Sequence, residues 1–91
     1  MTFIPDNPKD PNAVIDYAVD WTLWLDGDTI SSSIWTAATG ITIDSNTNTI
    51  TNSTVWLSGG TAGASYEVTN RVVTAGGRTD DRTILISVAE R

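Results

Sequence analysis

Apolar and polar residues alternate along most of this chain, in short runs that turn residues separate. A period of two is typical of half-buried β-strands, and no run has the length and spacing of an ordinary helix. The pattern predicts a first strand within Ala13–Leu25, and further strands at Thr29–Thr36, Gly40–Ser45, Thr49–Leu57, Tyr66–Thr74 and Thr83–Ala89.

The first of these segments combines two periods. From Ile15 to Val19 the odd-numbered residues are apolar and the even-numbered ones are small or acidic, as in a strand. Trp21, Trp24 and Leu25 instead have the spacing of one helical turn. We therefore expect a strand followed by a short helical turn.

The same alternation assigns residues to the faces of each strand. One face of the 66–74 strand carries Tyr66, Val68, Asn70 and Val72. The last strand turns Ile84, Ile86 and Val88 inward and Leu85 outward. In the 29–36 strand, Ile30 and Ile34 share one face and Trp35 lies on the other.

Turn residues separate the predicted strands. Asp26–Asp28 and Asn46–Asn48 have turn chemistry. Ala75–Arg78 is predicted to be a hairpin in which Gly76 and Gly77 supply the positive φ of a primed turn.

The segment Thr54–Arg71 indicates the architecture. An apolar run ends in Ser-Gly-Gly, and a bridge of small residues leads to Tyr66 at the start of the penultimate strand. In immunoglobulin-like sandwiches a tyrosine at this place hydrogen-bonds to the backbone a few residues upstream. We predict an all-β, immunoglobulin-like antiparallel sandwich of six or seven strands over residues 13–91, with Trp35 and Trp56 as structural core residues.

Residues 1–12 are predicted to form an extended N-terminal arm. All three prolines of the chain lie here, and proline favours extended backbone and donates no amide hydrogen bond. Such an arm can become ordered against a neighbouring protein. Its candidate partner-binding residues are Phe3, Ile4, Pro5 and Pro8.

Charge and composition exclude several partners. The net charge is −6, and residues 1–45 carry all of this excess. An acidic chain is repelled by phosphate backbones and anionic lipid surfaces, so we expect neither nucleic acid nor membrane as a partner. Cysteine is absent, so no disulfide supports the core. The N-terminus lacks the basic and apolar regions of a signal peptide, and we expect assembly in the cytosol.

Candidate chemistry is sparse. Histidine and cysteine are absent, so the serines have no ordinary base beside them, and no catalytic residue is predicted. Asp26 and Asp28 could offer oxygen ligands to calcium, but they lack the further acids of a calcium loop and are better explained as turn residues. We expect no cofactor and no metal.

Binding is the better-supported activity. Trp24, next to a turn, is the predicted interfacial tryptophan, because tryptophan is enriched in binding hot spots. Arg78 and Arg82 flank two acids beyond the hairpin, where they form local ion pairs, protect a strand edge or contact a partner. A carbohydrate-binding module with exposed tryptophans is a weaker alternative.

The chain resembles small phage and prophage structural proteins described as fibre–tail adaptors. The resemblance covers residues 12–91 and is carried by Asp16-Tyr17-x-x-Asp20-Trp21-x-x-Trp24-Leu25, Ser33-x-Trp35, Val55-Trp56-Leu57-Ser58-Gly59-Gly60-Thr61-Ala62-Gly63, Tyr66-x-Val68-Thr69-Asn70 and Gly77-Arg78-Thr79-Asp80-x-Arg82.

This resemblance implies an immunoglobulin-like virion protein without catalytic residues. It would be present in several copies, assembled in the host cytoplasm, and would attach tail fibres to the tail by docking on tail or fibre subunits. Capsid decoration and head–tail connection by the same fold stay open as alternatives.

Overall fold

Within residues 2–5 and 7–90, which the computed structural model describes, seven strands and one helical turn follow one another. They are β1 (Thr2–Phe3), β2 (Ile15–Asp20), α1 (Thr22–Leu25), β3 (Ile30–Ala37), β4 (Ile41–Asn48), β5 (Asn52–Gly59), β6 (Ser65–Thr74) and β7 (Thr79–Ser87). The predicted all-β fold, with a short helical turn after the first long strand, is confirmed. No helix in this part of the chain is long and apolar enough to cross a membrane.

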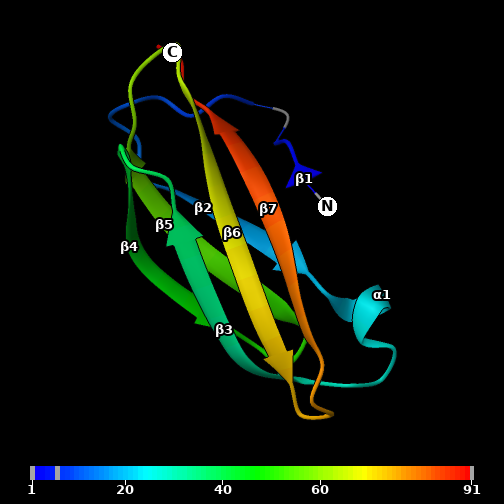
Figure 1. The fold of residues 1–91 in the computed structure, drawn as a ribbon. Helices are drawn as coiled ribbons and strands as arrows, with labels where there is room; N and C mark the ends of the chain where they lie inside the picture. The colour runs from blue at the N-terminus through cyan, green and yellow to red at the C-terminus, as the bar shows by residue number, and fades with distance from the viewer. Residues whose placement is uncertain (1, 6, 91) are drawn as a thin grey trace.

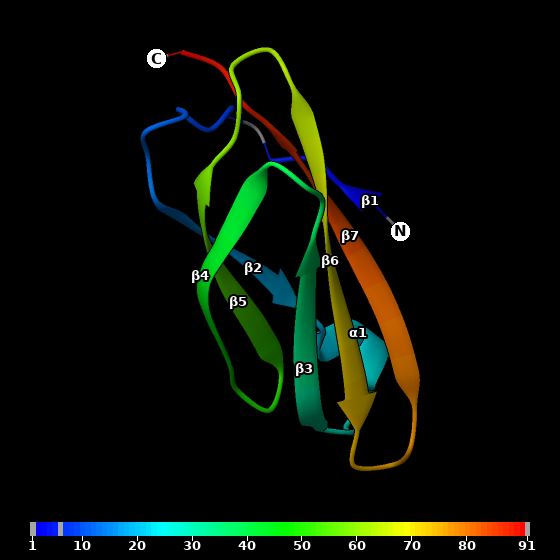
Figure 2. The same cartoon turned by 60° about the vertical axis from the view of Figure 1, so that its left-hand side comes forward.

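The strands form two facing sheets, β1-β7-β6-β3 and β2-β5-β4. Figures 1 and 2 show the two layers, with the C-terminus at the end opposite the β6–β7 hairpin. The long strands pair antiparallel, whereas β1 pairs in parallel with the edge of β7. The six long strands have the order of the C-F-G and B-E-D sheets of an immunoglobulin sandwich. The predicted β-sandwich is therefore present.

The core lies between the sheets, and alternation fills it. Side chains of β6 are buried and accessible by turns along the whole strand, as period-two patterning requires. The buried apolar side chains are Val19, Trp21, Leu25, Ile30, Trp35, Ile41, Val55, Leu57, Tyr66, Val68, Val72, Ile84, Ile86 and Val88. Burial of such side chains contributes about 1.5–3 kcal/mol for each large one, which makes this set the main apolar contribution to folding.

Asn70, on β6, is fully buried in the middle of this apolar core. Its Oδ1 accepts a hydrogen bond from Trp21 Nε1 at 3.0 Å. Its Nδ2 donates to Ser33 Oγ at 2.9 Å and to the Ile34 carbonyl at 3.2 Å. The amide thus connects β6 with β3 and with the residue that precedes α1.

Ser53 continues this network into the second sheet. It is fully buried on β5, and its hydroxyl accepts a hydrogen bond from Trp35 Nε1 at 2.8 Å. The Ser33 hydroxyl accepts a hydrogen bond from the Asn70 amide and is also hydrogen-bonded to the Ser53 hydroxyl. Among the described residues, every buried side-chain nitrogen and oxygen has a partner. A fully satisfied polar network therefore joins the two sheets across the core.

Tyr66 forms the predicted corner at the start of β6. Its hydroxyl accepts the backbone N–H of Thr61 at 2.8 Å. The ring lies against Gly40 and Gly60, both of which have positive φ. A Cβ at Gly40 would lie 2.7 Å from Tyr66 Cε1, so the close approach of backbone and ring requires glycine there.

Lys9 attaches the N-terminal segment to the sandwich. Its N–H donates to the Ser87 carbonyl at 2.8 Å, and its carbonyl accepts from Ala89 N–H at 2.9 Å. The fully buried side chain donates from Nζ to the carbonyls of Gly59 and Asp10, at 2.8 and 2.9 Å. Burial lowers the pKa of Lys9, and nearby carboxylates partly oppose that shift. Lys9 is therefore part of the folded body, although it falls within the predicted arm.

The face assignment for β3 is wrong at one residue. Ile30 is buried with Trp35, whereas Ile34, predicted to share the face of Ile30, is 57% exposed. The pairing of β3 with β6 shifts between Ile30 and Ser32. A bulge of this kind adds one residue and inverts the inward–outward order that follows it.

The β4–β5 turn lies later than predicted. Asn46–Asn48 are the last residues of β4, and the turn is formed by the three residues before Asn52, where β5 begins. The Thr49 hydroxyl accepts the N–H groups of Thr51 and Asn52, which closes the turn. Pairing of Asn48 with Ser53 outweighs the turn preference of the asparagines.

The β6–β7 hairpin uses its glycines in two different ways. Gly77 has φ +87° and donates its N–H to the Thr74 carbonyl at 3.0 Å, whereas Gly76 does not have positive φ. The predicted primed turn is therefore wrong. Gly76 leaves space for Asp28, because a Cβ there would lie 2.7 Å from the carboxylate and would displace it from its hydrogen bonds. The last strand also begins four residues earlier than predicted, at Thr79.

The polar network generates a stability prediction. Replacement Asn70→Ala leaves the buried Trp21 indole N–H without a partner and removes the amide that donates to Ser33 and Ile34, so the free energy of unfolding should fall by about 2–4 kcal/mol. Urea denaturation measures this loss, and Glu67→Gln, on the exposed face of the same strand, is the matched control. An Asn70→Ala protein as stable as this control would contradict the assigned role of the network.

Candidate docking surface

The structure brings together three of the seven residues predicted to bind a partner. Trp24, Arg78 and Arg82 lie around α1 and the start of β7. The other four belong to the N-terminal segment: Phe3, Ile4, Pro5 and Pro8. This segment contains β1, which pairs with the edge of β7. Figure 1 shows β1 and α1 beside β7. Ile4 is 60% exposed, and for Phe3 only the backbone falls within the described part of the chain.

Arg78 connects the β6–β7 hairpin to α1. Its Nη1 donates to the Trp24 carbonyl at 3.0 Å, and its Nη2 donates to the Leu25 carbonyl. Its Nε contacts Asp28 Oδ2 at 3.3 Å, and its guanidinium lies 4.4 Å from the centre of the Trp24 ring. A cation near the last carbonyls of a helix is favourable. Arg78 therefore fixes the position of α1 relative to the β6–β7 hairpin.

Arg82, on β7, makes the same two kinds of contact with Trp21 and the end of β2. Its guanidinium lies 4.2 Å from the Trp21 ring centre, and its Nη1 donates to the Asp20 carbonyl at 3.0 Å. The Trp21 and Trp24 rings meet edge to face, with centres 5.2 Å apart. Two arginine–tryptophan contacts thus enclose a tryptophan pair.

Two exposed apolar residues at this end were not predicted. Leu23, in α1, is 95% exposed, and Ile50, in the β4–β5 turn, is 62% exposed. The Thr51 carbonyl accepts Trp21 N–H at 2.9 Å, which ties the turn to α1. We call Leu23, Trp24, Ile50 and Arg78 the α1 end.

A sequence signal for Leu23 exists. The helical spacing that turns Trp21, Trp24 and Leu25 inward leaves Leu23 on the outer side of the turn. No comparable signal marks Ile50, because its exposure depends on where the β4–β5 turn falls.

The assignment of Trp56 to the core is wrong. It points outward from β5 and is 40% exposed, because Val55 and Leu57 take the inward positions on either side of it. Trp35, by contrast, is buried. The tryptophan most accessible to a partner is therefore Trp56 rather than Trp24.

Asp28 joins the β2–β3 connection to the β6–β7 hairpin at the α1 end. Its carboxylate accepts the N–H groups of Thr29 at 2.8 Å and Gly76 at 3.1 Å, besides its contact with Arg78. Hydrogen bonds from the Thr74 hydroxyl, from these backbone groups and from Arg78 lower the pKa of Asp28 to about 2. The predicted turn aspartate is thus an acceptor that joins the β2–β3 connection to the hairpin.

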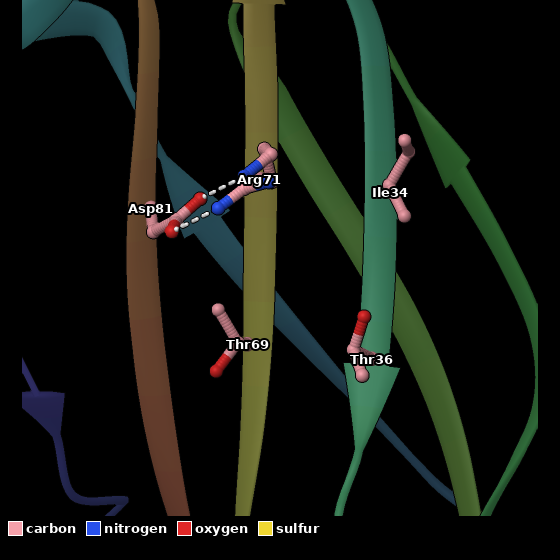
Figure 3. A pocket seen from close by; sticks show the side chains of 5 residues that line it. All are labelled: Ile34, Thr36, Thr69, Arg71 and Asp81. Carbon is pink, nitrogen blue, oxygen red and sulfur yellow. Dashed lines mark hydrogen bonds and ion pairs between the residues drawn. The ribbon is translucent and has the colours of Figure 1, made fainter.

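An open hollow of about 320 Å³ lies on the outer face of the β1-β7-β6-β3 sheet. Figure 3 shows its lining residues on β3, β6 and β7: Ile34, Thr36, Thr69, Arg71 and Asp81. Arg71 and Asp81 form a two-bond ion pair at 2.7 and 2.9 Å, which raises the pKa of Arg71 and lowers that of Asp81. The hollow holds no nucleophile with a base beside it, and the described residues contain no cluster of three potential metal ligands.

The described chain is thus a two-sheet β-sandwich that exposes apolar and aromatic side chains, among them Leu23, Ile50 and Trp56. The family model described as podophage GP4 fiber-tail adaptor protein gp77 matches residues 9–87, and the chain belongs to this family. Comparison with curated proteins finds no match. Membership confirms the resemblance to fibre–tail adaptors and implies a structural adaptor role in a phage particle.

The low pKa of Asp28 generates a pH prediction. Since its folded-state pKa lies below the ordinary value of 3.8, the carboxylate stabilises the fold above about pH 4. This contribution is lost as pH falls through about 2. Urea denaturation should therefore show Asp28→Asn less stable than the unsubstituted chain at pH 7, and the difference should shrink between about pH 4 and 2. A difference that does not change over this range would contradict the assigned hydrogen bonds.

Proposed function

We propose that this protein attaches a tail fibre to the phage tail by non-covalent docking, with the α1 end as one contact surface. The observation that carries the proposal is the 95% exposure of Leu23 on a helical turn that Arg78 and Trp24 hold in place. Family membership supports the adaptor role, and the geometry supports the place of contact.

The α1 end is suited to docking because it is rigid before it binds. Arg78 fixes the two carbonyls that end α1, Asp28 fixes the hairpin to the β2–β3 connection, and Trp24 packs on the buried Trp21. A surface ordered in advance loses little conformational entropy on binding. The exposed Leu23 and Ile50 then supply apolar area for a partner to cover.

The N-terminal segment is the second proposed contact. Lys9 anchors it to the sandwich, so the residues that can reach a neighbour are those before Lys9. Among them, Thr2 and Phe3 pair with β7 through only two registered positions, Thr83 and Ile84. So short a pairing leaves the segment available for exchange onto a tail or fibre subunit.

The remaining features of the proposal follow from this role. The protein acts without catalysis, in several copies per particle, and is assembled in the host cytoplasm. Its net charge of −6 disfavours DNA and anionic membranes as partners.

The apolar contact can be tested with Leu23→Ser. The substitution removes an exposed side chain, so stability should change by no more than about 0.5 kcal/mol. Incorporation into particles should fall about tenfold or more, because the partner loses the apolar area that Leu23 offers. Quantitative mass spectrometry of purified particles, with heads and tails separated before digestion, measures both amount and location.

Ile34→Ser, at an exposed isoleucine on the outer face of β3, is the matched control and should incorporate normally. Normal incorporation of Leu23→Ser would exclude the α1 end as a docking surface. Recovery of the unsubstituted protein with heads rather than tails would instead favour capsid decoration or head–tail connection.

The N-terminal contact can be tested with two deletions. Removal of residues 1–8 keeps Lys9, so the fold should persist while incorporation is lost. Removal of residues 1–12 also removes the buried Lys9 ammonium from the Gly59 carbonyl, and should lower the free energy of unfolding by about 1–3 kcal/mol more. Urea denaturation and particle mass spectrometry separate the two effects. Normal incorporation without residues 1–8 would refute the role of the segment.

A further inference from the structure

Trp56 differs from the other tryptophans near the surface. Trp21 lies under the guanidinium of Arg82, and Trp24 lies under that of Arg78. Trp35 is buried and bonded to Ser53. Trp56 is 40% exposed, and within residues 2–5 and 7–90 no cation lies over its ring.

The Arg78 contact shows what this arrangement lacks. There, one guanidinium covers a tryptophan ring and also reaches a carboxylate, that of Asp28, at 3.3 Å. At Trp56 the carboxylate is present, because Asp16 on β2 lies directly opposite Trp56 in the antiparallel register. Side chains opposite each other in such a pair have Cβ atoms about 5 Å apart. The Trp56 ring and the Asp16 carboxylate are therefore neighbours, but no arginine of the described chain stacks on this ring.

Two further carboxylates lie on the same sheet as Trp56 and Asp16. On the outer side of β2-β5-β4, Asp44 lies near Trp56 and bonds Ser58 Oγ at 2.6 Å, and Asp20 is exposed at the end of β2. Two of these acids have a cation nearby, because Lys9 interacts electrostatically with Asp44 and Arg82 with Asp20. Arg71 pairs with Asp81 on the other sheet, and Arg78 lies beside α1. Neither of the two ion pairs found among the described residues involves Asp16.

We propose that this face, centred on Trp56 and Asp16, binds an arginine-bearing segment of a partner protein. The partner guanidinium would stack on the Trp56 ring and donate to the Asp16 carboxylate, as Arg78 does with Trp24 and Asp28. Charge complementarity selects this occupant. The same face of a second copy would bring like charges together, and a neutral glycan would leave the acids without a counter-charge. The site is separate from the α1 end.

An arginine peptide tests the proposal without any assumption about the particle. An alternating glycine–arginine octapeptide is titrated into the ¹⁵N-labelled protein, and the indole N–H signals are followed by NMR. The Trp56 signal, assigned with Trp56→Phe, should shift, and the shift should weaken at high salt. The corresponding glycine–lysine peptide should bind several-fold more weakly, because an ammonium cannot stack and donate in the same way.

Substitutions locate the binding. Trp56→Ala and Asp16→Asn should each weaken arginine-peptide binding about threefold or more, whereas Trp56→Phe should retain most of it. Ile34→Ala, on the opposite sheet face, is the control and should leave binding unchanged.

Several results would overturn the proposal. The Trp56 signal could fail to shift at millimolar arginine peptide, or Trp56→Ala could bind as well as the unsubstituted protein. A shift of the Trp56 signal with cellohexaose in place of the peptide would identify a glycan site. A shift on concentrating the protein alone would identify self-association.

Discussion

The rest of this structure depends on the hydrogen-bond network around Asn70. A chain of 91 residues has a small core, and this one has no cysteine to join its sheets. In antibody domains a disulfide and a tryptophan on the third strand of the sandwich occupy the middle of the core. In this protein Trp35 lies on β3, and hydrogen bonds from the Asn70 amide through Ser33 to Ser53 connect the two sheets. Such a network stabilises the core only while every member has its partner, and in this core each one does.

The same network positions the surface. Asn70 holds the indole of Trp21, and Trp21 is the residue on which Trp24 packs and over which Arg82 lies. The orientation of α1 therefore follows from the hydrogen bond between Trp21 and Asn70 in the core. Leu23 points outward because Trp21 and Leu25 are buried on the other side of the turn. The core network and the proposed docking surface are therefore connected through Trp21. A substitution in the network would alter binding without touching a partner, so stability must be measured alongside any loss of incorporation.

Sequence patterning was sufficient where one face of a strand is wholly buried. The inward positions of β6 and β7, the helical spacing at Trp21 and Trp24, and the Tyr66 corner all follow from local periodicity. Sequence patterning failed where the register with a neighbouring strand determines which side chains face inward and where a strand ends. The bulge after Ile30 inverts Ile34, and the register with β5 carries β4 through Asn48. Trp56 was misplaced because size favours burial, whereas strand parity directs it outward. The clustering of Arg78 with Trp24 and Asp28 required tertiary structure, because about 50 residues separate Arg78 from the other two.

An adaptor between unlike partners needs two surfaces that do not compete, and the proposed surfaces differ in both place and chemistry. The α1 end offers apolar side chains, whose burial depends little on ionic strength, whereas the Trp56 face offers carboxylates, whose attraction for a basic segment weakens as salt screens it. The Trp56 face would also bring like charges together against its own copy, which favours an unlike partner there. Raising the salt concentration should therefore release a partner held at Trp56 while a partner held at Leu23 stays bound. This separates the two contacts in a single assembled particle.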